Sequence, residues 1–343
     1  MSNTPIRIGI IGAGANTRTR HIPGLRALDG VEIVAVCNRS DASSARVAQE
    51  FDIPAVYSRW SDLIADPEID AVVIGTWPYM HSRLTVAALE AGKHVLCEAR
   101  MAMNAAEAHL MLETAQRYPW LVAQIVPSPM TLAVDRTICR LLAEGYLGDV
   151  LAIEVNAGGT FLDFDAALHW RNDFDLSGFN TMSLGIWYEA VLRWVGHATR
   201  VMAMAKTYVK MRRTEAGTLG AVRIPEHIDV VADMACGAQL HIQVSSVTGL
   251  AGSPTVTLYG SRGTVRFTQN KLFGGRRGDS ELQGIAIPPA EAGGWRVEEE
   301  FVNAIRGLET VTHTSFEDGV KYMEFTEAAL RSSVEGCALA LPL

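Results

Sequence analysis

The chain has 343 residues, of which 48% are hydrophobic and 20% are charged, and its formal net charge is −8 at pH 7. This length suits two domains that each bury a core, and the composition is that of a folded globular protein. The negative charge argues against nucleic acid or an anionic membrane as a partner, because both attract clustered positive charge. We also expect no membrane partner because no apolar run reaches the length of about eighteen residues needed to span a bilayer, and no secretory leader precedes the first strand.

Five cysteines lie far apart, without the spacing of a zinc site or a disulfide framework: Cys37, Cys97, Cys139, Cys236 and Cys337. We interpret them as small buried apolar residues of a protein in a reducing compartment. The sequence therefore predicts a cytoplasmic protein without a metal site.

The first third of the chain alternates short apolar runs with amphipathic segments. The apolar runs are rich in Val and Ile, as are strands buried on both faces of a parallel sheet. They cover residues 6–11, 32–37, 71–75, 94–97 and 121–126, and helices are predicted over 40–51, 81–91 and 105–118. This alternation predicts an α/β domain with a doubly wound parallel sheet of the Rossmann type.

The pattern changes near residue 127. After a predicted helix over 131–144, strand-like segments are joined by short turns, which indicates antiparallel hairpins. These segments cover 150–156, 201–209, 226–235, 238–246, 255–259 and 264–268, and helices over 295–307 and 316–335 close the chain. We therefore predict a nucleotide-binding domain over 1–127 and an α+β domain over 128–343 with a large open, mostly antiparallel sheet.

A glycine-rich turn follows the first predicted strand. Gly12 permits a tight turn, and Gly14 lets the backbone approach a pyrophosphate at a helix N-terminus. Thr17 stands where the dinucleotide-binding motif has its third glycine, so the motif is incomplete. The predicted cofactor loop comprises Gly12, Gly14, Ala15, Asn16 and Thr17.

The end of the second predicted strand bears on the choice of cofactor. An NAD-specific site usually has Asp or Glu there, which accepts a hydrogen bond from the ribose 2′-hydroxyl. This sequence has Asn38, Arg39 and Ser40 instead. Asn38 carries no charge, and Arg39 with Ser40 offers groups for a 2′-phosphate. The predicted cofactor is therefore NADP, with NAD as the alternative; Arg39 could also be a surface residue that caps a loop.

These motifs together resemble the Gfo/Idh/MocA family, which includes glucose–fructose oxidoreductase and inositol dehydrogenase. The most specific match is the segment 88–98, and further matches are 76–81, 142–150, 170–171 and 260–264. The resemblance covers essentially the whole chain. It implies a Rossmann domain and a second domain whose open sheet packs face to face in oligomers. Because a sheet with helices on one face leaves its other face uncovered, we predict a homodimer or homotetramer. It also implies cofactor contacts from Thr76, Trp77, His81 and Glu98.

Three departures fall where the resemblance implies catalytic groups. Ala99 replaces a lysine, while Ser183 and Trp187 replace an aspartate and a histidine. None of these three side chains can act as a general base at neutral pH. The remaining candidates are Arg100, Tyr188 and His169 for catalysis, with Arg171 and Trp187 for substrate binding.

The catalytic candidates differ in the chemistry they permit, and Tyr188 and His169 also suit structural roles. Arg100 stays charged at ordinary pH, so it can hold an anion or an oxyanion but cannot act as a base. Tyr188 suits a core position equally well, and Glu189 beside it is expected to face solvent. His169 has a suitable pKa range but also suits a structural role. We expect His81 to belong to the cofactor loop and not to catalyse.

Three functional hypotheses share an intact cofactor site. The first is an NAD(P)-dependent oxidoreductase with a remodelled active site that acts on a sugar, polyol or cyclic-alcohol derivative. Its reaction is either hydride transfer or transient oxidation followed by elimination. The second is a non-catalytic dinucleotide-binding regulator or sensor. The third is a catalytic partner that receives its missing groups from another subunit.

Overall fold

The structure, a computed structural model, describes residues 5–343, and the contacts within it divide the chain into two compact units. The first unit runs up to Pro127 and includes Arg296–Val320, and the second contains Ser128–Trp295 and Lys321–Leu343. The sequence pattern also divides at residue 127, but it assigned all of 128–343 to the second domain. The returning segment 296–320 groups instead with the first unit.

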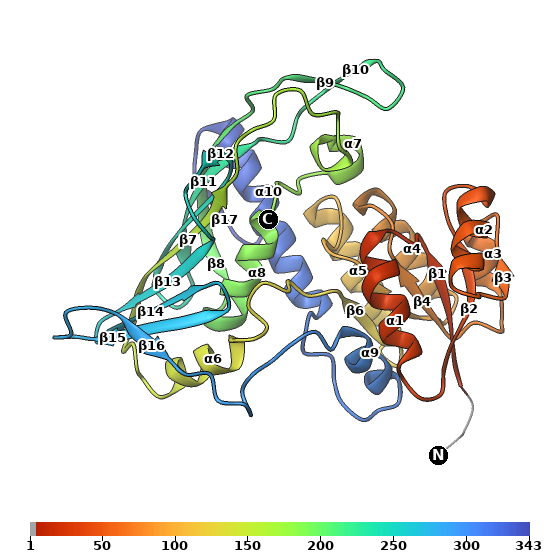
Figure 1. Cartoon of the computed structure of the whole chain (residues 1–343), viewed down its shortest axis with the longest axis horizontal. Coiled ribbons are helices and arrows are strands. Elements are labelled where there is room, and N and C mark those ends of the chain that lie inside the picture. Colours follow the sequence, from red (N-terminus) through yellow and green to blue (C-terminus); the bar gives the residue numbers. More distant parts are fainter. Residues whose placement is uncertain (1–4) are drawn as a thin grey trace. The chain divides into compact units, whose positions relative to one another are not determined.

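The first unit contains a six-stranded sheet whose neighbouring strands are all parallel, in the order β3-β2-β1-β4-β5-β6 (Figure 1). The strands are β1 (Ile6–Ile11), β2 (Val31–Cys37), β3 (Ala55–Val56), β4 (Ala71–Ile74), β5 (His94–Cys97) and β6 (Ala123–Ile125). This strand order is that of the doubly wound dinucleotide-binding fold. The predicted fold class is thus confirmed for this unit.

Helices connect these strands. They are the π-helical turn η1 (Thr17–His21), α1 (Ile22–Arg26), α2 (Asp41–Glu50), α3 (Trp60–Ala65), α4 (Pro78–Glu90) and α5 (Ala105–Arg117), and α9 (Val297–Ile305) joins them from the returning segment. Helix α4 begins three residues before its predicted start, at Pro78, because proline presets the backbone angle of a first helical turn. Helix α5 is capped by Asn104, whose side chain accepts a hydrogen bond from the Glu107 N–H at 2.8 Å.

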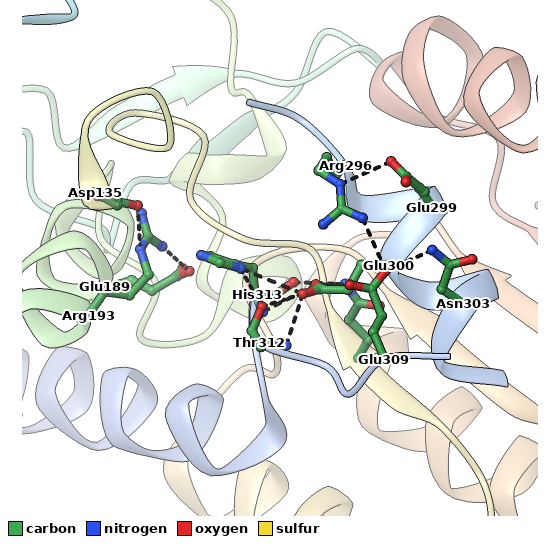
Figure 2. A network of polar contacts seen from close by, with 11 residues as sticks. Asp135, Glu189, Arg193, Arg296, Glu299, Glu300, Asn303, Glu309, Thr312 and His313 are labelled. Carbon is green, nitrogen blue, oxygen red and sulfur yellow. Dashed lines mark hydrogen bonds and ion pairs between the residues drawn. The ribbon is translucent and has the colours of Figure 1, made fainter. Parts of the chain in front are cut away.

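The returning segment is held against the edge strand β6. Thr314 and Ile125 exchange two backbone hydrogen bonds of 3.0 Å each. The Gln124 side chain donates to Glu300 at 3.0 Å and to the His313 carbonyl at 2.7 Å. Glu300 also accepts from the Thr312 N–H at 3.0 Å (Figure 2). These long-range bonds explain why 296–320 groups with the first unit. Helical periodicity cannot predict them.

The second unit is built on a nine-stranded sheet in the order β16-β15-β14-β13-β7-β12-β11-β8-β17. Its strands are β7 (Val150–Gly159), β8 (Ala198–Lys206), β11 (His227–Met234), β12 (Gln239–Gly249), β13 (Thr255–Gly260), β14 (Gly263–Thr268), β15 (Lys271–Arg276), β16 (Gln283–Ile285) and β17 (Leu339–Ala340). Only β7 and β12 are paired in parallel within this sheet. The predicted open, mostly antiparallel sheet is thus confirmed, and a short hairpin of β9 (Met211–Arg213) and β10 (Leu219–Ala221) stands apart from it.

Helices cover one face of this sheet. Helix α8 (Leu184–Val195) contacts β12, and α10 (Phe316–Glu335) contacts β8. The other helical elements of this unit are α6 (Asp135–Ala143), η2 (Trp170–Asn172) and α7 (Phe174–Ser177). Ser332 of α10 accepts a 3.0 Å hydrogen bond from the Ala203 N–H of β8. On the other face of β8 and β11, Met202, Met204 and Val231 are 49%, 78% and 43% exposed. This face of the sheet is therefore open and partly apolar.

Two general expectations can be compared with the structure. Cys37 and Cys97 are buried, but Cys139, Cys236 and Cys337 are exposed, so the expectation of five buried cysteines was wrong for three of them. Between residues 5 and 343, none of the helices is both long enough and apolar enough to cross a bilayer.

Candidate active site

The glycine turn lies directly after β1, at the carboxyl edge of the parallel sheet. Gly12 has a φ of +85°, and a Cβ there would lie 2.6 Å from the Thr76 Cγ2 and 2.7 Å from the Thr76 nitrogen. A Cβ on Gly14 would lie 3.3 Å from the Gly75 carbonyl oxygen. Glycine is thus required at position 12 for two reasons: the backbone has a positive φ, and there is no room for a Cβ. Gly14 and Ala15 are exposed, which leaves the turn open to a ligand.

Thr17 occupies the place of the third glycine of the motif. Its side chain is only 1% exposed, and its hydroxyl donates to the Gly12 carbonyl at 3.3 Å. A Cβ on Gly75 would overlap both the Thr17 hydroxyl and the Gly12 carbonyl. The close approach of helix and sheet is thus permitted by Gly75, at the end of β4. Thr17 packs inside the protein, so its side chain supports the turn from within.

Asn38 lies at the end of β2, where a ribose contact was predicted. Its Oδ1 accepts from the Ala13 N–H at 2.7 Å, and its Nδ2 donates to the carbonyl and the hydroxyl of Ser43, each at 3.2 Å. The Asn38 side chain therefore ties the glycine turn to α2. Arg39 and Ser40 are exposed, and Ser40 caps α2 by accepting from the Ser43 N–H at 3.3 Å.

The loop after β4 is fixed by His81. This ring is completely buried, with its nitrogens 2.9 Å from the Thr76 carbonyl and 2.9 Å from the Arg100 carbonyl. Burial lowers the pKa of His81. His81 thus joins the loops after β4 and β5 and does not face solvent. Trp77 is half-buried at the start of α4, and the Thr76 hydroxyl is buried with no hydrogen-bond partner among residues 5–343.

Glu98 follows β5 and belongs to a buried polar cluster. One of its oxygens lies 3.0 Å from the His21 Nε2 and also accepts from the Asn16 side chain, and the other accepts from the Ala99 N–H at 3.1 Å. Burial favours the protonated form, but the hydrogen bond and charge of His21 outweigh it and hold the pKa of Glu98 below its usual value. Sequence reasoning missed His21, because its partners lie far away along the chain.

Tyr188 and Trp187, two of the predicted site residues, lie in the core of the second unit. Tyr188 is fully buried, stacks on Phe325 with ring centroids 3.7 Å apart, and accepts from the Ala198 N–H at 2.7 Å. Burial raises its pKa further above the ordinary value. Trp187 is 4% exposed and packs near Phe267 of β14. Their predicted roles in catalysis and substrate binding were therefore wrong.

Glu189 was expected to face solvent but is buried as well. It accepts from the Arg193 Nη1 at 2.8 Å (Figure 2). It also accepts from the Ser128 N–H at 3.0 Å. Arg193 also donates to Asp135 at 2.9 Å. This ion-paired group holds α8 against α6 and the chain before it, so it is structural.

His169 and Arg171 lie in an exposed segment of the second unit. The His169 Nδ1 accepts from the Arg171 N–H at 3.3 Å, so a neutral ring carries its proton on Nε2. Partial burial and the charge of Arg171 lower the pKa of His169. The ring thus presents an N–H donor and no free base nitrogen. The Arg171 guanidinium lies 4.2 Å from the centroid of the Trp170 ring.

These observations fit a nicotinamide dinucleotide in the first unit. The left-handed Gly12 leaves a backbone cradle that any Cβ would fill, and the Thr76 hydroxyl beside it is an unpartnered buried polar atom. Such a turn before a helix N-terminus suits a pyrophosphate. The groups able to hold the dinucleotide are the backbone of Gly12, Gly14, Ala15 and Asn16, the side chains of Arg39 and Ser40, and the Thr76 hydroxyl.

A parallel sheet with this strand order and a glycine turn after β1 defines a Rossmann-type nucleotide-binding protein. Residues 6–124 match the model of the oxidoreductase family with an NAD-binding Rossmann fold, and residues 136–266 match that of the GFO/IDH/MocA C-terminal domain. The chain belongs to the Gfo/Idh/MocA oxidoreductase family.

Individual relatives and a solved structure agree with this assignment. An uncharacterized oxidoreductase of Rhizobium meliloti is 30% identical over 190 residues, 55% of this chain but only 56% of that relative. The trans-1,2-dihydrobenzene-1,2-diol dehydrogenase of Sus scrofa is 27% identical over 75% of this chain and 72% of its own length. A levoglucosan dehydrogenase, solved with NADH and L-sorbose, has the same fold, with a TM-score of 0.87 and 21% identity over 98% of this chain and 99% of its own.

The contact between Gly75 and the glycine turn makes a testable prediction. A Gly75→Ala substitution should destabilise the protein by about 1–3 kcal/mol, because the added methyl group forces the turn away from β4. Urea unfolding measures the change. The control is Gly294→Ala, where no atom lies within 4 Å of the added carbon. Equal stability of the two variants would contradict the packing described.

Proposed function

We propose that the protein is an NAD(P)-dependent oxidoreductase with a remodelled active site, which acts on a sugar-like, polyol or cyclic-diol substrate. The glycine turn at Gly12, open at Gly14 and supported by Asn38, carries this proposal. The family assignment supports it, as do the sugar and diol substrates that the names of the two dehydrogenases state. The five free cysteines support a reducing, cytoplasmic location.

The side chains of this chain restrict the chemistry. A nicotinamide dinucleotide held at the glycine turn would supply hydride transfer to or from a substrate carbon. Oxidation of a plain alcohol also needs a base for the hydroxyl proton. Ala99 offers no base, Tyr188 is confined to the core, and His169 presents an N–H. We therefore propose a substrate that needs little help from a base.

Three kinds of substrate meet this condition. One is already a carbonyl compound and is reduced, and another has an acidic carbon-bound proton. The third carries an anionic group, which Arg100 in the first unit or Arg171 in the second can hold as a permanent cation. Transient oxidation of the substrate followed by elimination is a further route, for which the dinucleotide would supply the hydride chemistry.

The residues after β2 predict the choice of cofactor. Arg39 is exposed, and segment 38–40 has no carboxylate to repel a 2′-phosphate. NADPH should bind about ten- to a hundredfold more tightly than NADH, since one charge-assisted hydrogen bond contributes roughly 1.5–3 kcal/mol. Calorimetric titration of both cofactors against the wild type and Arg39→Ala tests this. Equal affinities, or no loss of NADPH affinity in the variant, would contradict it.

The open face of the second unit predicts self-association. Met202 pairs in register with Val231, and both face away from the helices together with Met204. We propose that a second copy covers this face in a homodimer or a dimer of dimers. Light scattering at micromolar concentration should give at least twice the monomer mass, and Met204→Lys should lower it. A wild-type monomer would refute the proposal.

The remodelled site makes a prediction about turnover. The wild type should oxidise glucose and myo-inositol negligibly, because absence of a general base costs about two to four powers of ten in rate. With a substrate found among ketones and anionic polyols, Arg100→Met or Arg171→Met should reduce kcat/KM at least tenfold while the dinucleotide Kd stays within about twofold.

Several outcomes decide between the hypotheses. Full turnover in both variants would contradict the assignment of these arginines. Brisk oxidation of a simple polyol by the wild type would contradict the remodelled site. Dinucleotide binding without turnover of any compound would favour the regulator or sensor.

A further inference from the structure

His21 is a buried titratable group that the chemistry above does not use. It ends the π-helical turn η1, which follows the glycine turn, and its side chain has no exposed surface. Both of its ring nitrogens face carboxylates. The Nε2 lies 3.0 Å from Glu98, and the Nδ1 lies 2.5 Å from Glu298. A ring that donates on both sides to carboxylates is an imidazolium.

The second carboxylate comes from the returning segment. Glu298 is in the first turn of α9 and is only 4% exposed. Gly24 makes room for it, because a Cβ at that position would lie 2.9 Å from the Glu298 carboxyl carbon. The place of Glu298 is thus built into α1 as well as into α9. If Glu298 touched α1 only by chance at the surface, a side chain at position 24 would not interfere with it.

The first carboxylate leads to the cofactor turn. Glu98 accepts from the side chain of Asn16, which is the residue directly before η1. The other Glu98 oxygen accepts from the Ala99 N–H, at the start of the loop after β5. A chain of hydrogen bonds therefore runs from α9 through His21 and Glu98 to the end of the glycine turn. Asn16, directly before η1, is the last group of this chain of hydrogen bonds.

We propose that Glu98, His21 and Glu298 form a positioning triad that holds the glycine turn in its dinucleotide-binding conformation, and that deprotonation of His21 releases the turn. Their side chains are largely buried and bind one another, so we assign the three residues a positioning role. The inference rests on the dinucleotide site proposed above and adds a pH dependence to it.

The direction of this pH dependence follows from the charges around His21. Burial alone lowers the pKa of the ring, but the hydrogen bonds and charges of Glu298 and Glu98 outweigh burial and raise it to about 9. The facing charges come from α9 and from the end of β5. Because the folded-state pKa is raised, the stabilisation is complete below about pH 6.5 and is lost as the pH rises through about 9. Dinucleotide affinity should fall over the same range.

Binding and NMR titrations together test the triad. NADH fluorescence titrations from about pH 7 to about pH 10 should show the wild-type Kd rising about tenfold, with the midpoint near the pKa of His21. His21→Gln should bind about tenfold more weakly at neutral pH, with a Kd that no longer changes over this range. In the protein without ligand, the His21 ring resonance should titrate near pH 9.

A matched control is His94→Gln in the same unit. The His94 Nδ1 accepts from the Val122 N–H at 2.9 Å, and its pKa is lowered by burial. This variant should keep the wild-type pH dependence of the NADH Kd. If His21→Gln does not fold, Glu298→Gln serves instead and should shift the binding midpoint to lower pH, because the ring then loses one facing charge.

The outcomes separate the triad from the proposed function. A wild-type Kd that is constant to about pH 10, or a His21 ring that titrates near its ordinary pKa of about 6.5, would overturn the triad while leaving the oxidoreductase proposal intact. Failure of the wild type to bind NADH or NADPH at any pH would overturn the cofactor site and the coupling, even if the ring titrates near pH 9.

Discussion

The close approach of the glycine turn to the strand beside it is the constraint on which the nucleotide-binding unit depends. Gly12 in its left-handed conformation leaves no room for a Cβ against Thr76, and Gly75 leaves none against Thr17. The turn is held from the other side by Asn38, which binds the Ala13 N–H. The close packing against the neighbouring strand and the Asn38 side chain thus hold the turn in place, with its backbone accessible to a pyrophosphate.

The sequence predicted the sheets well because their signals are local. Strands β1, β4 and β5 are continuous buried runs, and their periodicity does not depend on distant partners. Strand β15 was missed, since its adjacent glycines, Gly274 and Gly275, weaken the apolar pattern. Its pairing with β14 is decided by tertiary contacts.

Site residues could be predicted from the sequence only where they belong to a recognisable motif. Gly12 and Gly14 were found from spacing, but Glu298 reaches His21 from a segment that returns to the first unit late in the chain. Tyr188 was predicted for catalysis and Trp187 for substrate binding because of their side-chain chemistry. Only the packing of α8 shows that both lie in the core. The part of the site formed by long-range contacts is therefore the part that the sequence could not give.

Hydrogen–deuterium exchange with and without NADPH can show whether the glycine turn binds the dinucleotide, because it reports on the turn without requiring a substrate. We expect NADPH to slow exchange at residues 12–17 and 75–77, while exchange in the buried helix α8, Leu184–Val195, stays unchanged. Unchanged exchange at the glycine turn under saturating NADPH and NADH, or protection confined to the second unit, would contradict the account.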